Sequence, residues 1–191
     1  MALRTQMREK VRAAILDAAE ELIAERGLQA TALAQIAAKG GVAVGTLYNY
    51  FEDRDALVRA LFESRRATLK PKLQAAMVAG KALAFEPRLR TFMRDLFAAF
   101  EDHRRYLAAM FAAEHLKPQG AHADMKTAID ELVAAGVAEG VIAKDAAEIL
   151  TIMLRGSIRS VIVHRLETGG AFPDDADAVV TLMLDGARKR R

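Results

Sequence analysis

Apolar side chains recur at helical spacing over the first part of the chain. Successive members of the first stripe are four, three and four residues apart: Val11, Ile15, Ala18 and Leu22. This spacing places them on one face of an amphipathic helix. Gly27 predicts the end of that helix, because glycine is the usual residue just beyond a helix C-terminus.

Two shorter helices are predicted next, separated by a pair of glycines. Residues 33–39 carry apolar side chains at helical spacing, and Thr31 is expected to accept a hydrogen bond from a free N–H at the start of this helix. Gly40 and Gly41 then end it, since each destabilises a helix by about 1 kcal/mol relative to alanine. A third helix is predicted over residues 44–50, so that two short helices meet across a tight turn.

The remainder of the chain also has helical periodicity. A longer helix is expected to begin near the acids Glu52, Asp53 and Asp55, which supply capping oxygens and negative charge, and to reach the region of Pro71. Four or five helices are expected beyond residue 80, with breaks near Pro87, His103, Pro118 to Gly120, Gly140, and Gly169 to Pro173. Because no segment shows the alternation of a strand, the fold class is predicted to be all-α.

Composition and chain length limit the compartments in which this protein is expected. The chain has 191 residues, of which 52% are hydrophobic, with four prolines and no cysteine. The absence of cysteine excludes disulfides and thiolate sites and fits a reducing compartment. The first ten residues lack the apolar core of a signal peptide, and no stretch of about 18 apolar residues could span a membrane. We therefore expect a cytoplasmic protein with no membrane partner.

Bulk charge does not identify a partner. The formal net charge is +3, but the last four residues are all basic, and without them the chain carries −1. A local excess of positive charge lies near the start, where Arg4, Arg8, Lys10 and Arg12 are accompanied by one acid, Glu9. This cluster is either an electrostatic surface for nucleic acid or a solvated helix start.

The turn between the second and third predicted helices carries a recognisable motif. The segment from Gly41 to Phe51 reads GVAVGTLYNYF. Together with Thr31, Ile36 and Ala37 upstream, it closely resembles the DNA-binding head of tetracycline-repressor (TetR) family regulators, over roughly residues 8–66. A short helix with small residues at its start also suits the major groove, which is about 12 Å wide.

By this resemblance the chain has two domains. Residues 1–54 are expected to form a helix-turn-helix DNA-binding domain, with the motif at about 31–50. Residues 55–191 are expected to form a helical regulatory and dimerisation domain. The expected architecture is therefore an N-terminal three-helix head followed by a larger helical domain that binds a ligand and forms the dimer.

The resemblance also implies which side chains face DNA. Five residues of the third helix are expected there: Val44, Gly45, Thr46, Tyr48 and Asn49. Small residues permit close approach, hydroxyls suit phosphate oxygens, and an amide suits a base edge or a phosphate. Thr31 and Arg54 are expected to bind phosphate, the alternative for Arg54 being an ordinary surface cation. Tyr50 either contacts phosphate or walls the core, and Leu47 is expected in the core.

Three positions depart from the family pattern. Ala32 and Ala43 stand where the family often has Ser or Thr at a helix cap or phosphate contact. Losing such a cap typically costs about 1 kcal/mol. Val44 replaces a common polar residue, and we expect it to read thymine methyl groups.

The second domain is expected to bind the effector. Large and flexible side chains gather between residues 89 and 115, where such stripes either pack the core or line a cavity. The resemblance implies that some of them line a pocket for a largely apolar small molecule. The candidates are Phe92, Met93, Phe97, Tyr106, Met110 and Phe111. Arg155 is a further candidate, which would bind an anionic ligand in the pocket. The alternative is that Arg155 forms an ion pair between subunits or at the surface.

The last two predicted helices carry more apolar surface than one core needs. Residues 145–167 are apolar nearly all round, and a second apolar stripe covers residues 179–184. A helix that is apolar all round must be buried on two sides. We therefore expect a homodimer with a four-helix interface formed by the helices near 145–168 and 174–187.

Patterns of catalysis and metal binding are missing from the sequence. The four histidines are scattered without the i, i+4 spacing of a helical metal site, and there is no phosphate-binding loop or nucleophile elbow. We expect neither an enzyme nor a metal or other cofactor. The expected function is a ligand-responsive repressor, released from a pseudo-palindromic double-stranded DNA operator by a small molecule. The alternatives are control by a protein partner, and an all-α dimeric binding module without DNA activity.

Overall fold

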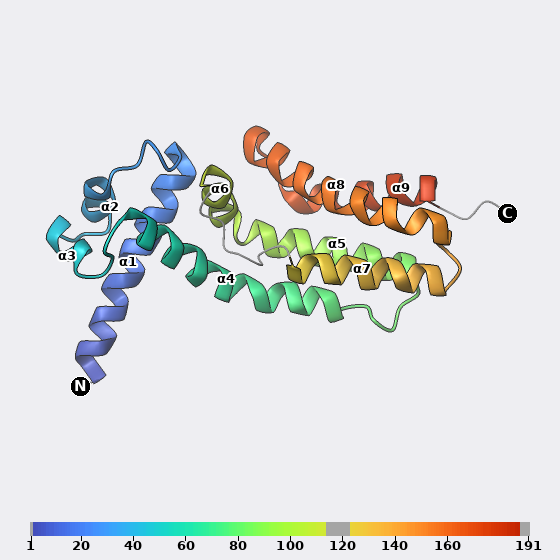
Figure 1. Ribbon diagram of the computed structural model, residues 1–191, viewed down its shortest axis with the longest axis horizontal. Helices are drawn as coiled ribbons and strands as arrows, with labels where there is room; N and C mark the ends of the chain where they lie inside the picture. Colours follow the sequence, from blue (N-terminus) through green and yellow to red (C-terminus); the bar gives the residue numbers. More distant parts are fainter. Residues whose placement is uncertain (1, 114–122, 188–191) are drawn as a thin grey trace. The chain divides into compact units, whose positions relative to one another are not determined.

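The computed structural model describes residues 2–113 and 123–187, and these residues have the predicted all-α fold (Figure 1). The first four helices are α1 (Ala2–Arg26), α2 (Leu33–Lys39), α3 (Val44–Tyr48) and α4 (Arg54–Val78). They are followed by α5 (Phe85–Glu101), α6 (Arg104–Ala112), α7 (Ala123–Ala138), α8 (Ala147–Thr168) and α9 (Ala176–Ala187). Short 3-10 turns, η2 (Lys144–Ala146) and η3 (Phe172–Asp175), precede α8 and α9. None of the helices in the described ranges is long and apolar enough to cross a membrane.

Two prolines lie inside helices, where breaks were expected. Pro71 is part of α4, which continues to Val78, because Leu69 and Ala76 on either side of the proline are buried and hold the helix in the packed structure. Pro87 is in the first turn of α5, where a backbone N–H has no partner within the helix and its loss is harmless. The break expected near residues 118–120 lies outside the described residues.

The described residues divide into two compact units, and the division falls within α4. The first unit holds the residues up to Thr68 together with 103–113, and the second holds Leu69–Asp102 and the residues from 123 onward. Packing therefore groups the first turns of α4 and the whole of α6 with the three N-terminal helices. The expected boundary at residue 54 stays a proposal about the DNA-binding segment.

The first unit is built around α1. Its core consists of side chains that are at most 1% exposed, drawn from all of its first four helices: Ile15, Ala19, Ile23, Ile36, Leu47, Leu57 and Leu61. Helix α6 packs against α1, and the ring of Tyr106 meets Phe62 edge to face at 5.9 Å between centroids. The short helices α2 and α3 are too short to be stable alone. Their position therefore depends on packing against the longer helices of the first unit.

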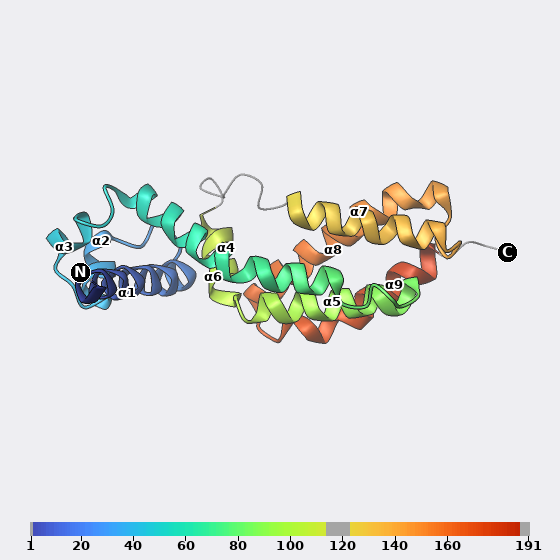
Figure 2. The same ribbon diagram turned by 90° about the horizontal axis from the view of Figure 1, so that it is seen from below.

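The second unit is centred on α5, whose apolar face is wholly buried. Helix α5 packs against α9 and α7, and α7 packs against α8 (Figures 1 and 2). Gly136 permits the approach of α7 to α5, because a Cβ atom at this position would lie 2.8 Å from the ring of Phe85. The carboxylate of Glu139 accepts a hydrogen bond from the Phe85 N–H at 2.7 Å, and so caps the start of α5 from the end of α7.

Candidate functional site

Helix α3 presents most of its side chains to solvent and is anchored by one. Leu47 is fully buried against the core of the first unit, whereas Val44 is 41% and Tyr48 52% exposed. Gly45 is exposed, and among the described residues no atom outside its own turn of helix lies within 4 Å of where its Cβ would be. Asn49 is exposed and Thr46 half-buried. The five residues expected to face DNA therefore lie on a helix that a flat or grooved partner can approach closely.

The turn before α3 has the geometry that its glycines predict. Gly41 has a φ of +69°, which is a left-handed conformation that favours glycine. The N–H of Val42 then donates to the carbonyl of Ala37 at 2.9 Å, which closes the end of α2. The turn is short, so α2 and α3 are held at a fixed angle as a helix-turn-helix requires.

Thr31 does not have the role expected of it. Its side chain is 1% exposed, and its hydroxyl lies 2.8 Å from the carbonyl oxygen of Gly27 and 3.2 Å from that of Leu22. The N-cap of α2 is Ala32 instead. Thr31 is therefore a buried donor to carbonyls at the end of α1, which neither caps α2 nor offers its hydroxyl to a phosphate.

Arg54 and Tyr50, the other two proposed phosphate contacts outside α3, are both half-buried. A terminal nitrogen of Arg54 donates to the carbonyl of Thr31 at 2.9 Å. The Tyr50 ring lies under the guanidinium of Arg8, 5.7 Å from ring centroid to guanidinium carbon. Both side chains thus have partners within the first unit, and their contact with DNA stays a proposal.

Both helices of the motif begin without a side-chain cap. Ala32 and Ala43 occupy the N-cap positions of α2 and α3, and neither has a side-chain oxygen. At α2 one half of a capping box is present, because the Gln35 side chain accepts a hydrogen bond from the Ala32 N–H at 3.0 Å. The reciprocal bond, from the N–H of Gln35 to a side-chain oxygen at the N-cap, cannot form because alanine has no such oxygen.

An arginine in α4 ties that helix to α1. Arg65 donates through Nε to Glu20 at 2.8 Å and through a terminal nitrogen to Asp17. Burial lowers the pKa of Arg65, but its hydrogen bonds and the charges of the two carboxylates more than offset this and raise it. No sequence pattern indicates this group, because Arg65 lies more than forty residues from both of its partners.

The apolar side chains of the second unit enclose a narrow gap between α5, α7 and α8. It is lined by Leu89, Phe92, Met93, Ile129, Leu132, Leu154 and Ile158. The gap is not wide enough for a water molecule. No polar atom lines it, so any occupant would have to be apolar.

Of the residues expected to line a pocket, the structure brings only Phe92 and Met93 to this gap. Phe97 is buried elsewhere in the second unit. Tyr106, Met110 and Phe111 lie on α6, in the first unit. Arg155 is exposed on α8 and does not reach the gap. The lining residues of α7 and α8 were missed, because apolar residues that pack a core and those that line a gap have the same sequence pattern.

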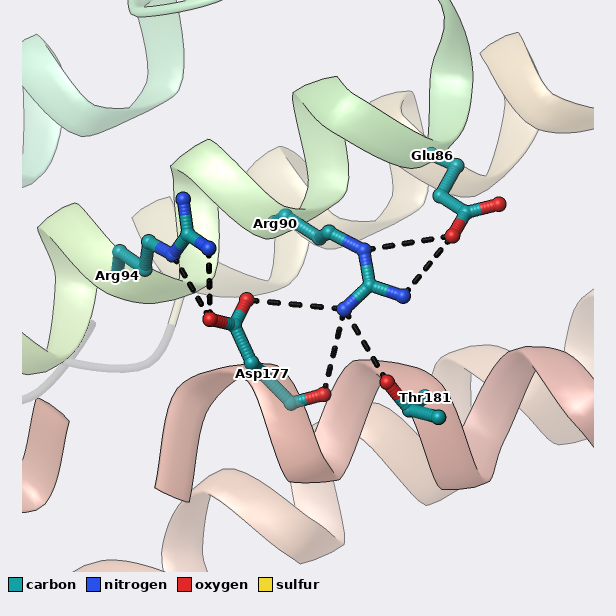
Figure 3. A network of polar contacts seen from close by, with 5 residues as sticks. All are labelled: Glu86, Arg90, Arg94, Asp177 and Thr181. Carbon is teal, nitrogen blue, oxygen red and sulfur yellow. Dashed lines mark hydrogen bonds and ion pairs between the residues drawn. The ribbon is translucent and has the colours of Figure 1, made fainter. Parts of the chain in front are cut away.

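A polar network joins α5 to α9 (Figure 3). Arg94 donates two hydrogen bonds to one oxygen of Asp177, at 3.1 and 2.6 Å. Arg90 donates to the carboxylate of Glu86 and to the hydroxyl of Thr181, and lies 3.6 Å from the second oxygen of Asp177. The hydrogen bond from Arg94 holds the pKa of Asp177 below its ordinary value, and the charges of both arginines act in the same direction.

Helix α8 has an apolar face that the described residues leave uncovered. Leu150, Leu154, Ile158 and Ile162 form its buried row. On the opposite face Ile149 and Ile152 are each 55% and Met153 is 49% exposed. On α9, Leu182 is 77% exposed. The sequence indicated that α8 must be buried on two sides, and residues 2–113 and 123–187 bury one of them.

Comparison with known proteins assigns the N-terminal segment to a family. Residues 15–61 match the family described as bacterial regulatory proteins, tetR family. The HTH-type transcriptional repressor Rv3405c of Mycobacterium tuberculosis is 46% identical over 56 residues, which are 29% of this chain and 30% of that protein. The fatty acid metabolism regulator protein of Bacillus subtilis is 41% identical over 51 residues, 27% of this chain and 26% of that protein. The matched segment thus spans less than a third of each curated relative.

Solved structures resemble nearly the whole chain in fold. The ketosteroid transcriptional regulator KstR2 of Mycobacterium tuberculosis has a TM-score of 0.73 at 18% identity, covering 94% of this chain and 95% of that one. The fatty acid degradation regulator FadR of Bacillus halodurans has a TM-score of 0.71 at 21% identity, covering 94% and 97%. FadR of Bacillus subtilis, solved with stearoyl-CoA, has a TM-score of 0.69 at 17% identity, covering 92% and 99%. Similarity at this level establishes a shared fold.

Proposed function

The chain belongs to the tetR family of bacterial regulatory proteins through its N-terminal domain, and from this premise we propose that it is a transcriptional repressor released from operator DNA by a small molecule. The observation that carries the proposal is the exposed face of α3, which consists of small, hydroxyl-bearing and amide side chains. Leu47, on the other face, is buried and holds the helix in place. A short helix of this kind suits the major groove.

The proposed DNA contacts have distinct roles. Val44 and Gly45 lie at the start of α3, where the absence of bulk lets the backbone approach the base edges, and the methyl groups of Val44 meet those of thymine. The hydroxyls of Thr46 and Tyr48 bind phosphate oxygens, and Asn49 binds a base edge or a phosphate. In a dimer the two α3 helices enter successive major grooves about 34 Å apart, so the operator is pseudo-palindromic.

Selection of binding sites from random duplexes tests this proposal. The wild-type protein should recover a two-fold half-site whose affinity falls steeply with salt. Tyr48→Ala should weaken that affinity by tenfold or more, whereas Gln29→Ala, at an exposed position outside the motif, should leave it unchanged. Replacing thymine by uracil should weaken binding at one position of each half-site, and indifference at all positions would remove the role assigned to Val44.

The proposed effector is a largely apolar small molecule that separates α5 from α7 and α8. The all-apolar lining of the gap supports this class of ligand, and a structural neighbour was solved with stearoyl-CoA. Because the gap is closed to water, the ligand must bind a second conformer. Reversing a 99:1 preference for the DNA-binding conformer requires about 5.5 kcal/mol of differential binding. Helix α4 is the proposed lever, since it contributes residues to both units.

Stearoyl-CoA and free stearate serve as probes for this site. Either should raise the unfolding midpoint and release selected DNA from the wild-type protein. Leu132→Phe, which fills the gap, should weaken the release, and Arg155→Met, at an exposed position beyond the gap, should not. Release that is lost in Arg155→Met and kept in Leu132→Phe would contradict this placement and favour an anionic anchor at Arg155.

A second candidate is a regulator controlled by a protein partner. The gap between α5, α7 and α8 favours it, because this gap has no space for even a water molecule among the described residues. In this case a screen of apolar compounds produces no thermal shift, while DNA binding responds to a partner protein. A compound that both stabilises the protein and releases DNA would instead support the repressor controlled by a small molecule.

A further inference from the structure

One face of the N-terminal half of α1 carries a row of arginines. Arg4, Arg8 and Arg12 are four residues apart on the same helix, so they form a line along one face. The guanidinium carbon of Arg12 is 5.6 Å from the ring centroid of Phe51, and that of Arg8 is 5.7 Å from the centroid of Tyr50. These two rings lie two and three residues beyond the end of α3, so the row begins near the end of α3 and continues toward the start of α1.

The row becomes more exposed along its length. Arg12 is half-buried over its ring, and Arg8 and Arg4 are exposed. In Figure 1 the first turns of α1 extend beyond the rest of the three-helix head. Arg12 is therefore held in place by packing, while the guanidinium groups of Arg8 and Arg4 are free to meet another molecule.

Within the described residues these three arginines have no carboxylate partner, although arginines elsewhere do. Arg65, Arg94 and Arg165 each bind at least one carboxylate, whereas in the described part of the chain Arg8 and Arg12 each lie over an aromatic ring. Of the nearby acids, Glu9 lies about 100° round the helix from Arg8, and Asp53 accepts a hydrogen bond from the N–H of Ala56.

We propose that the Arg4–Arg8–Arg12 row is a second DNA-binding surface, on which Arg4 and Arg8 bind phosphates beside the groove that α3 enters. The inference rests on the proposed function and extends it to a segment outside the helix-turn-helix. Guanidinium groups bind phosphate oxygens in a bidentate manner, and the rings of Tyr50 and Phe51 hold the row in line with α3 by cation–π contact. Its contribution is independent of base sequence and dependent on salt.

Lys10 provides a matched control in the same two turns of helix. It is exposed and lies about 160° round the helix from Arg8, on the opposite face. Arg4→Gln, Arg8→Gln and Lys10→Gln each remove one positive charge per subunit. If the charged helix start is merely solvated, the three variants should behave alike.

The test measures the affinity of full-length wild type and of each variant for a selected duplex and for a random duplex, across a series of salt concentrations. Each lost phosphate contact lowers the slope of log affinity against log salt by about 0.9. A dimer loses two contacts, so in Arg4→Gln and in Arg8→Gln the slope should fall by about 1.8 on both duplexes. Doubling the salt should then weaken wild-type binding about 3.5-fold more than that of either variant. Lys10→Gln should keep the wild-type slope, and all unfolding midpoints should agree.

Two outcomes would overturn the inference, and they are distinguishable. Equal slopes in Arg4→Gln, Arg8→Gln and Lys10→Gln, with wild-type binding intact, would show that Arg4 and Arg8 do not bind phosphate. This outcome would not contradict the proposed function. If the wild-type protein binds no duplex in a salt-dependent manner, both the DNA-binding role of the row and the proposed function are wrong.

Discussion

Among single residues, Thr31 shows how a side chain beside a binding motif can serve the fold. Its hydroxyl is buried between the carbonyl oxygens of Gly27 and Leu22, with the shorter contact, 2.8 Å, to Gly27. That contact holds the chain as it leaves α1 and turns toward α2. Thr46, by comparison, is half-buried on α3 and is proposed to bind phosphate. The two threonines should therefore respond differently to the same substitution.

We expect Thr31→Val to lower the free energy of unfolding by about 1–2 kcal/mol, because valine keeps the shape of threonine but leaves a buried carbonyl without its donor. The affinity of the folded protein for selected DNA should stay as in wild type. Thr46→Val should do the reverse, with near-normal stability in urea unfolding and weaker DNA binding. The phosphate contact first expected of Thr31 would be reinstated if Thr31→Val bound DNA poorly while unfolding normally.

At the scale of helices, the head has a motif whose two helices begin uncapped. Each N-cap is an alanine, and at α2 only the Gln35 half of the capping box is made. Helix α2 has seven residues, so an unsatisfied first turn is a large part of it. Its position depends on the burial of Ile36 and Ala37.

Ala32→Ser should complete the capping box and raise the free energy of unfolding by about 0.5–1 kcal/mol. Ala34→Ser, at an exposed position inside the same helix, should be neutral or slightly destabilising, because serine is a poorer helix former than alanine. Urea midpoints of the two variants measure the difference. Equal midpoints would mean that the start of α2 is not limited by its missing cap.

The network between α5 and α9 gives an acid-dependent contribution to stability. The pKa of Asp177 is below its ordinary 3.8 in the folded protein, chiefly through the hydrogen bond from Arg94. The unfolded chain therefore binds more protons than the folded chain as the pH falls through this range. The stabilisation is present at neutral pH and is lost on acidification below about pH 4.

Asp177→Asn should accordingly lower stability at neutral pH and show a shallower loss of stability than wild type between about pH 5 and pH 3. The effect should be small, because Asp177 is half exposed and water screens the pair. Asp185→Asn, which alters an exposed carboxylate on the same helix, is the control and should follow the wild-type curve. Parallel curves for Asp177→Asn and wild type would show that the network is not linked to protonation.

At the scale of the whole molecule, the apolar face of α8 that the described residues leave uncovered is the proposed dimer surface. Ile149, Ile152 and Met153 are about half exposed on the face opposite the buried row, and nothing lies within 4 Å of the Cβ position of Gly156 on the same face. A second copy of α8 could approach closely there, which supports the proposed homodimer through α8 and α9.

Met153→Glu should convert the protein from a dimer to a monomer of 20.8 kDa, because two carboxylates would meet across a two-fold interface. Affinity for a pseudo-palindromic operator should fall with it, since a monomer carries one α3 helix. Ala134→Glu, at an exposed position on α7, should remain dimeric. Light scattering after size exclusion gives both masses, and a Met153→Glu dimer would place the interface elsewhere.

The pattern of residues within short segments of the sequence was sufficient to predict the class of fold, most of the helices and the position of α3. Helix periodicity depends on residues three and four apart, and the Gly41 to Phe51 segment contains its own turn and anchor, so both are visible without tertiary contacts. The apolarity of α8 on two sides was visible for the same reason. The continuation of α4 through Pro71 was not, because burial on either side of the proline outweighed its local effect.

The tertiary structure alone decided which side chains meet. It buried Thr31, selected Phe92 and Met93 from the pocket candidates, and placed Asp177 beside Arg90, a residue 87 positions earlier in the chain. It also distinguished the arginines of α1, which have no acidic partner in the described residues, from those of α5, which do. Such contacts depend on how helices pack across the fold, and the packing angle and register of distant helices leave no periodic signal in the sequence.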